Sequence, residues 1–171
     1  MINLVKAELR KILCKKSILV LWALILGFGF ILIRDFEMLE TYADIFYKIE
    51  GSLPLIGLVS FITISGNYTR EYESNMVGLI NTTKNGKKYI TIAKAVAAGI
   101  SIALINVSFA LLVGIKGFMF ENFKGLDIPI KNLWYFGNSG SEITVLQMYL
   151  IMLASIILGS FLLAQIGLTL S

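Results

Sequence analysis

Long apolar stretches alternate with charged stretches along this chain, and each apolar stretch has about the length of a membrane-crossing helix. Four windows contain no Asp, Glu, Lys or Arg, namely Ser17–Ile33, Gly51–Thr69, Ala95–Ile115 and Ile143–Ser171. A helix crosses a bilayer with about 17 to 25 residues. The pattern therefore predicts an all-α membrane protein with about four transmembrane helices, at residues 17–33, 53–69, 95–115 and 144–169.

The N-terminal segment has the periodicity of an amphipathic helix. Apolar residues recur at helical spacing and most basic residues lie outside that stripe; the apolar set is Ile2, Val5, Leu9, Ile12 and Leu13, and the basic set is Lys6, Arg10, Lys11, Lys15 and Lys16. We expect this helix to lie on the inner leaflet, with its apolar face in the lipid and its basic residues as an anchor among the headgroups. The pattern fits a cytoplasmic extension of the first transmembrane helix equally well.

A second amphipathic pattern follows the second window. Tyr72, Met76, Leu79 and Ile80 lie at i, i+4, i+7 and i+8, which predicts a short helix. Asn85-Gly86 then marks a turn before the third window. This loop consequently has the form of a helix and a turn that present an apolar face to a partner.

The two remaining connections also carry patterns. Residues 36–50 place apolar and charged residues on separate stripes, which predicts an external interfacial helix; the apolar stripe is Phe36, Leu39, Ala43 and Phe46, and the polar stripe is Glu37, Glu40, Asp44 and Lys48. The loop before the fourth window is rich in aromatic residues, including Trp134 and Tyr135. Trp and Tyr are typical of the headgroup level of a membrane.

The distribution of basic residues gives an orientation. Residues 1–17, 34–52, 67–94 and 116–142 contain 5, 2, 5 and 3 Lys and Arg residues, which together make the 15 of the whole chain. Cytoplasmic loops carry the excess of Lys and Arg. The N-terminus and residues 67–94 are therefore predicted to be cytoplasmic, and the other two loops external, in a multi-pass protein of the cell membrane.

Composition excludes several classes of function. The chain has no His and a single cysteine, Cys14, so it lacks the residues of a His-bearing triad, a His-rich zinc site or an intramolecular disulfide. It contains no G-x-x-x-x-G-K-[ST] nucleotide loop, and no charged residue lies in any apolar window. We therefore expect no catalytic residue, metal or cofactor, and any energy for transport should come from another subunit. Because the basic residues flank apolar windows, they indicate membrane anchoring rather than nucleic-acid binding.

Two segments resemble a known family, the ABC-2 type transporter permeases. Residues 69–94 are similar to the family's loop between the second and third spans: Glu71 follows the second span, Gly78, Leu79 and Ile80 lie in the middle, and Lys87, Lys88, Ala93 and Lys94 precede the third. Residues 6–16 resemble the family's N-terminal connecting helix. The resemblance implies that residues 1–171 form one permease domain whose short helix couples to an ATPase, through Glu71, Tyr72, Met76, Gly78, Leu79 and Ile80.

The same resemblance implies partners and a function. Such a permease pairs with a second copy or a homologous permease, docks separate ABC ATP-binding subunits, and exports a peptide, an antibiotic or a lipid-like substrate. Family members usually have more spans than the windows found here, which suggests a fragment of a six-span unit. The alternative is a small membrane-embedded immunity or regulatory protein that binds a target through its outer aromatic loops and needs no ATPase.

Overall fold

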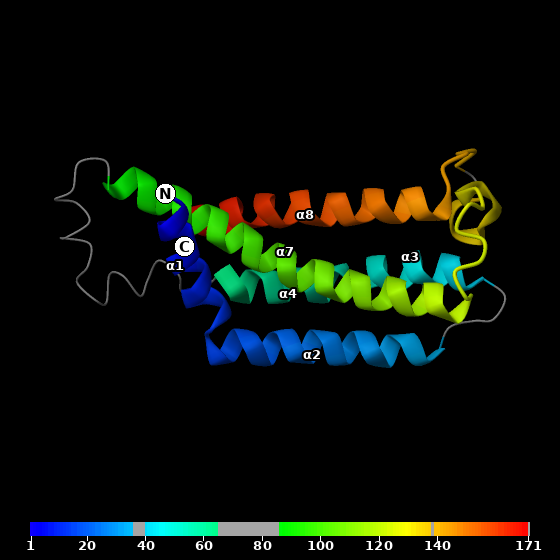
Figure 1. The fold of residues 1–171 in the computed structure, drawn as a ribbon, viewed down its shortest axis with the longest axis horizontal. Helices are drawn as coiled ribbons and strands as arrows, with labels where there is room; N and C mark the ends of the chain where they lie inside the picture. The colour runs from blue at the N-terminus through cyan, green and yellow to red at the C-terminus, as the bar shows by residue number, and fades with distance from the viewer. Residues whose placement is uncertain (36–39, 65–85, 138, 171) are drawn as a thin grey trace. The chain divides into compact units, whose positions relative to one another are not determined.

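The protein is described by a computed structural model over residues 1–35, 40–64, 86–137 and 139–170. Within these ranges the chain is helical, with no strand beyond an isolated β-bridge between Pro129 and Thr144 (Figure 1). The predicted all-α class is therefore confirmed. The elements are α1 Ile2–Leu13, α2 Lys16–Leu32, the 3₁₀ turn η1 Ile33–Asp35, α3 Thr41–Gly51, α4 Leu53–Ile64, α7 Gly86–Phe120, the 3₁₀ turns η2 Ile130–Asn132 and η3 Trp134–Phe136, and α8 Val145–Leu170.

Two of the described helices are long and apolar enough to cross a membrane, at Tyr89–Phe120 in α7 and Val145–Thr169 in α8. The pairs α1 with α2 and α3 with α4 also reach that length and apolar character together, but they bend by 68° and 42°. The chain thus has two to four candidate membrane spans, which suggests a membrane protein.

Local sequence sets the ends of the longest helices. At the start of α8, the Thr144 N–H donates to Gln147 Oε1 and the Gln147 N–H donates to Thr144 Oγ1, at 3.1 and 3.3 Å, which is a capping box. At the end of α7, Asn122 has a φ of 52° and the Phe123 N–H bonds to the Phe118 carbonyl at 2.8 Å. A left-handed Asn with this backward bond ends a helix. As a result α7 runs past the predicted end of the third span at Ile115; at its other end it begins at Gly86, before the predicted start at Ala95.

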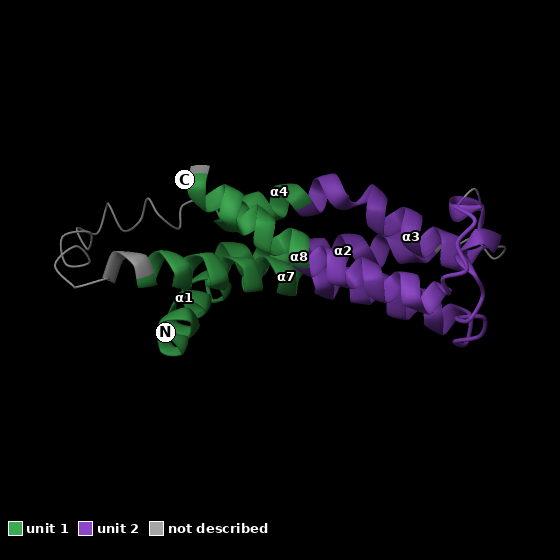
Figure 2. Ribbon diagram, turned by 90° about the horizontal axis from the view of Figure 1, so that it is seen from above, with its two compact units in different colours: residues 1–22, 57–105, 158–171 green, residues 23–56, 106–157 purple. Residues whose placement is uncertain are grey.

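The described helices divide into two compact units (Figure 2). Unit 1 comprises Met1–Trp22, Gly57–Ile105 and Leu158–Ser171. Unit 2 comprises Ala23–Ile56 and Asn106–Ile157. Four helices are divided between the units, with one part in unit 1 and the other part in unit 2: α2, α4, α7 and α8.

Each unit is packed through glycines that face large side chains. In unit 1, a Cβ at Gly99 would overlap the ring of Phe161. In unit 2, a Cβ at Gly114 would overlap the ring and hydroxyl of Tyr149, which donates to the Ala110 carbonyl at 2.9 Å. Small residues permit this close approach of helices where lipid cannot drive association.

Candidate functional site

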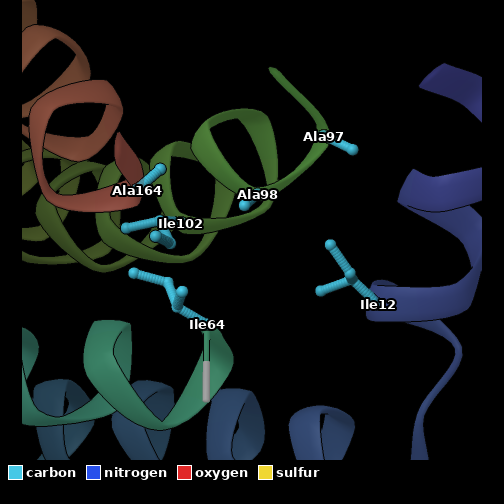
Figure 3. Close-up of a cluster of buried hydrophobic side chains, with 6 residues drawn as sticks. All are labelled: Ile12, Ile64, Ala97, Ala98, Ile102 and Ala164. Atoms are coloured by element: carbon cyan, nitrogen blue, oxygen red, sulfur yellow. The ribbon is translucent and has the colours of Figure 1, made fainter. Parts of the chain in front are cut away.

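The predicted amphipathic helix forms as α1, and it packs against the other helices of unit 1. Ile12 is 6% exposed and joins a buried cluster with residues of α4, α7 and α8, against which Val5 and Leu9 also pack. Figure 3 shows the side chain of Ile12 directed toward Ala97 on α7. The rest of the cluster is Ile64, Ala98, Ile102 and Ala164.

This packing differs from the expectation that the apolar face of α1 lies in lipid. Val5, Leu9 and Ile12 face the protein, whereas Ile2 from the same predicted stripe is 83% exposed. Helix periodicity shows that one side of α1 is apolar but does not say whether lipid or protein covers it. The 68° bend between α1 and α2 also shows that α1 is not a straight extension of the first span.

The predicted anchor residues lie on α1 and at the start of α2. Lys6, Arg10, Lys11 and Lys16 are exposed, and Lys15 is half-buried. Lys11 donates to Glu8 at 2.5 Å. These side chains are therefore fixed to a helix that is itself docked on unit 1.

The predicted coupling residues lie outside the described residues. Glu71, Tyr72, Met76, Gly78, Leu79 and Ile80 all belong to the segment 65–85. The helices that flank this segment in sequence are described, since α4 ends at Ile64 and α7 begins at Gly86. Both flanking helices contribute to the cluster under α1.

Lys94 occupies a position that the sequence analysis did not anticipate. It was grouped with the basic residues at the membrane surface, but it is only 3% exposed. Lys94, Ala97, Ala98 and Ser101 follow one face of α7 and are all buried. The spacing of these small residues was visible in the sequence and could have predicted a buried position for this lysine.

Unit 2 ends in a cap where the loop 121–144 packs on α3. Aromatic rings make many of the contacts: Phe46 lies edge-on to Phe136 with ring centres 5.1 Å apart, and Tyr47 lies 6.1 Å from Trp134. The predicted interfacial helix is thus largely buried, including Asp44 from its polar stripe, which is 8% exposed. Asp44 is buried because the loop folds over α3.

Polar contacts hold the same cap together. Thr41 donates to Glu121 at 2.5 Å, the Trp134 N–H donates to Glu40 at 3.0 Å, and Tyr135 donates to Glu50. The hydrogen bond to Glu50, with burial and the nearby negative charge, raises the pKa of Tyr135 to about 12. A pocket of about 480 Å³ opens beside this network, lined by Glu40, Thr41, Tyr42, Glu121, Lys124, Ile128, Asn132 and Leu133.

An ion pair lies on α3, where the sequence predicted an external interfacial helix. Asp44 and Lys48 form an ion pair at 3.7 Å on α3, with side chains only 11% and 13% exposed. Because α3 and α4 together qualify as one bent span, this pair would lie within a membrane-crossing segment of the described chain. Intramembrane charges are kept paired in this way because an isolated charge in lipid is costly.

Among the described residues, no group of three or more Cys, Asp or Glu side chains could hold a metal ion. The basic residues of α1 in unit 1 and the polar cap of unit 2 are the two sites that the described residues form.

No protein-family model, curated protein or solved structure matches this chain, so the ABC-2 resemblance rests on the residues quoted for it.

Proposed function

We propose that the chain is the membrane subunit of an ABC-type exporter, and that a separate ATP-binding subunit supplies the energy. One observation carries this proposal. In unit 1, α1 shares one buried apolar cluster with Ile64 at the last described turn of α4 and with α7, the two helices that flank residues 65–85. An ATP-binding subunit that displaces residues 65–85 would therefore move α4 and α7, which one apolar cluster joins to α1.

The form of α7 supports transmission of such a movement. It is a single helix from Gly86 to Phe120, about 52 Å long at 1.5 Å per residue. Near its far end, Phe118 packs against Tyr42 and Tyr149 in unit 2, with ring centres 6.1 and 5.0 Å apart. The single helix α7 therefore contributes its first part to unit 1 and its last part to the α3 and α8 contacts of unit 2.

The remaining features of the proposal come from the resemblance and the charge pattern. The chain is a multi-pass protein of the cell membrane with a cytoplasmic N-terminus, and it pairs with a second copy or a homologous permease. It carries no catalytic residue itself. Its substrate is a peptide, an antibiotic or a lipid-like molecule.

The cap bears on the immunity or regulatory alternative. That alternative requires the aromatic loop to be available for a target, but Tyr135 and Phe136 pack edge-on to each other and against α3. Tyr135 and Phe136 thus help to close unit 2, whereas Phe123 and Trp134 of the same loop are each 56% exposed. An adjacent gene for a nucleotide-binding subunit would separate the two functions at once.

Co-purification tests the proposal directly. We expect Met76→Asp or Leu79→Asp to abolish co-purification of the ATP-binding subunit and to leave membrane insertion intact, because a charge on the predicted apolar stripe would disrupt its docking. The matched control is Ser74→Asp, which adds the same charge on the opposite side of the predicted helix. Equal recovery of the ATP-binding subunit with Met76→Asp and Ser74→Asp would contradict the proposal.

A further inference from the structure

The pocket in the cap of unit 2 has the size and the lining of a small-molecule site. Its volume of about 480 Å³ falls within the range of about 300 to 1,000 Å³ that such sites occupy. Two carboxylates line it: Glu40 lies just before α3, and Glu121 lies just after α7. We call it the cap pocket.

Hydrogen bonds from the protein position both carboxylates. Thr41, which is 2% exposed, donates to Glu121 Oε1 at 2.5 Å. The Trp134 N–H donates to Glu40 Oε2 at 3.0 Å. Among the described residues, the second oxygen of each carboxylate accepts no hydrogen bond. An ionised carboxylate can accept about four hydrogen bonds, so both glutamates are held in place and both can still accept from a ligand.

The same two carboxylates lack a counter-charge. Another acid of the cap, Glu142, forms an ion pair with Lys131. Within the described chain neither Glu40 nor Glu121 forms an ion pair, although Lys124 also lines the cap pocket. Two carboxylates and one ammonium give the lining a net charge of −1. A partly buried charge without a partner is costly, so the cap pocket favours a cation.

The rest of the lining selects the kind of cation. Tyr42 and Leu133 are 6% and 7% exposed, and Ile128 is 38% exposed, so an apolar wall stands beside the carboxylates. A bare metal ion would make no use of this wall. Among the described residues, no group of three Cys, Asp or Glu side chains could hold such an ion. An organic ammonium ion with an apolar body would use both parts of the lining.

One side of the cap pocket is closed by a turn that α3 holds in place. The Tyr42 hydroxyl on α3 donates to the Lys124 carbonyl, and the Lys124 N–H bonds to the Glu121 carbonyl at 3.1 Å. Gly125 follows with a φ of 80°, a left-handed conformation that glycine adopts readily. The turn is therefore fixed without a ligand, which lowers the cost of ordering on binding.

We propose that the cap pocket binds a primary amine that carries an apolar group. Glu40 and Glu121 accept hydrogen bonds from its ammonium, and the apolar wall packs against the rest of the molecule. The lining belongs entirely to unit 2 and requires no ATP-binding subunit, so this inference is independent of the exporter function. Because the basic-residue distribution predicts that residues 34–52 and 116–142 are external, we expect the amine to come from outside the cell.

Isothermal titration of the full chain tests this inference. The probe is 2-phenylethylamine, added to the chain in micelles of a neutral detergent, with the heat of addition to micelles alone subtracted. We expect saturable binding of one amine per chain. The neutral analogue 2-phenylethanol has the same apolar body and should bind about tenfold more weakly or less. Glu121→Gln should also weaken amine binding about tenfold, because Gln keeps an acceptor for Thr41 but loses the charge.

The matched control is Glu50→Gln, which removes the same charge from a residue of the cap that bonds to Tyr135 and lies outside the pocket lining. It should leave the affinity for the amine unchanged. Lys124→Gln should strengthen amine binding, because it removes a like charge from the lining.

Four results would overturn the inference. The first is the absence of saturable amine binding, and the second is equal affinity for 2-phenylethylamine and 2-phenylethanol, which needs no variant to be folded. The third is an equal loss in the Glu121 and Glu50 variants, which would show that only total charge matters. The fourth is weaker amine binding after Lys124→Gln, which would show that the lysine holds the ligand.

Discussion

Substitution of Ile12 by alanine should release α1 from unit 1. Ile12 is 6% exposed, and its side chain joins the cluster formed by α4, α7 and α8. Truncation of a buried Ile to Ala costs about 2 to 5 kcal/mol. We use the lower end, about 2 kcal/mol, because Val5 and Leu9 also hold the helix but are only partly buried. That cost raises the population of undocked α1 about 30-fold.

A cysteine at Ala97 reports this change. Ala97 is fully buried and faces Ile12, so in a Cys14→Ser background an Ala97→Cys thiol should react slowly with a maleimide. When closing is faster than labelling, the rate follows the open population. We expect Ile12→Ala to raise the labelling rate about 30-fold. The native Cys14, which is exposed, gives the rate for an unprotected thiol.

The matched control is Ile2→Ala, which makes the same substitution on the same helix at a residue that is 83% exposed. It should leave the labelling rate unchanged. Equal rates for the Ile12 and Ile2 variants would refute the docking of α1. The same conclusion would follow if Ala97→Cys already reacted as fast as Cys14 in the unsubstituted helix.

Three further predictions use other contacts. Gly114→Ala should lower the melting temperature in detergent, because the added methyl group would overlap the ring of Tyr149. The control Gly27→Ala, where no atom lies within 4 Å of the added methyl group, should be neutral or stabilising by up to about 1 kcal/mol. The raised pKa of Tyr135 adds stability that is complete below pH 10 and is lost as the pH rises toward about 12, so Tyr135→Phe should remove that part of the alkaline destabilisation in thermal melts. Glu71→Gln should lower ATPase stimulation by the full chain far more than Glu73→Gln; equal effects would identify Glu71 as an ordinary solvated charge.

Local periodicity was enough to predict the helices but not what covers them. The stripe of Val5, Leu9 and Ile12 was visible in the sequence, and α1 forms there. Its covering surface was not predictable, because it comes from α4, α7 and α8, which lie far along the chain. Lys94 differs, because the small residues Ala97 and Ser101 that follow it on the same face of α7 were visible in the sequence and could have predicted its burial.

The cap was missed for a related reason. The sequence showed the aromatic density of the loop before α8 and the amphipathic pattern of α3, and each alone is typical of a membrane interface. The contact of Tyr135 with Glu50 joins residues 85 positions apart. No local pattern records such a pairing, so the two segments were interpreted separately although they bury one another.

Topology mapping tests the central claim most directly, since the exporter function requires residues 65–85 to be cytoplasmic. Reporters fused after Ser74 and Gly86 should score as internal, and reporters fused after Met38 and Gly125 should score as external, in line with the distribution of 5, 2, 5 and 3 basic residues over the four charged blocks. An internal score at Met38 or an external score at Ser74 would contradict the account, because the ATP-binding subunit could then not reach the predicted coupling helix.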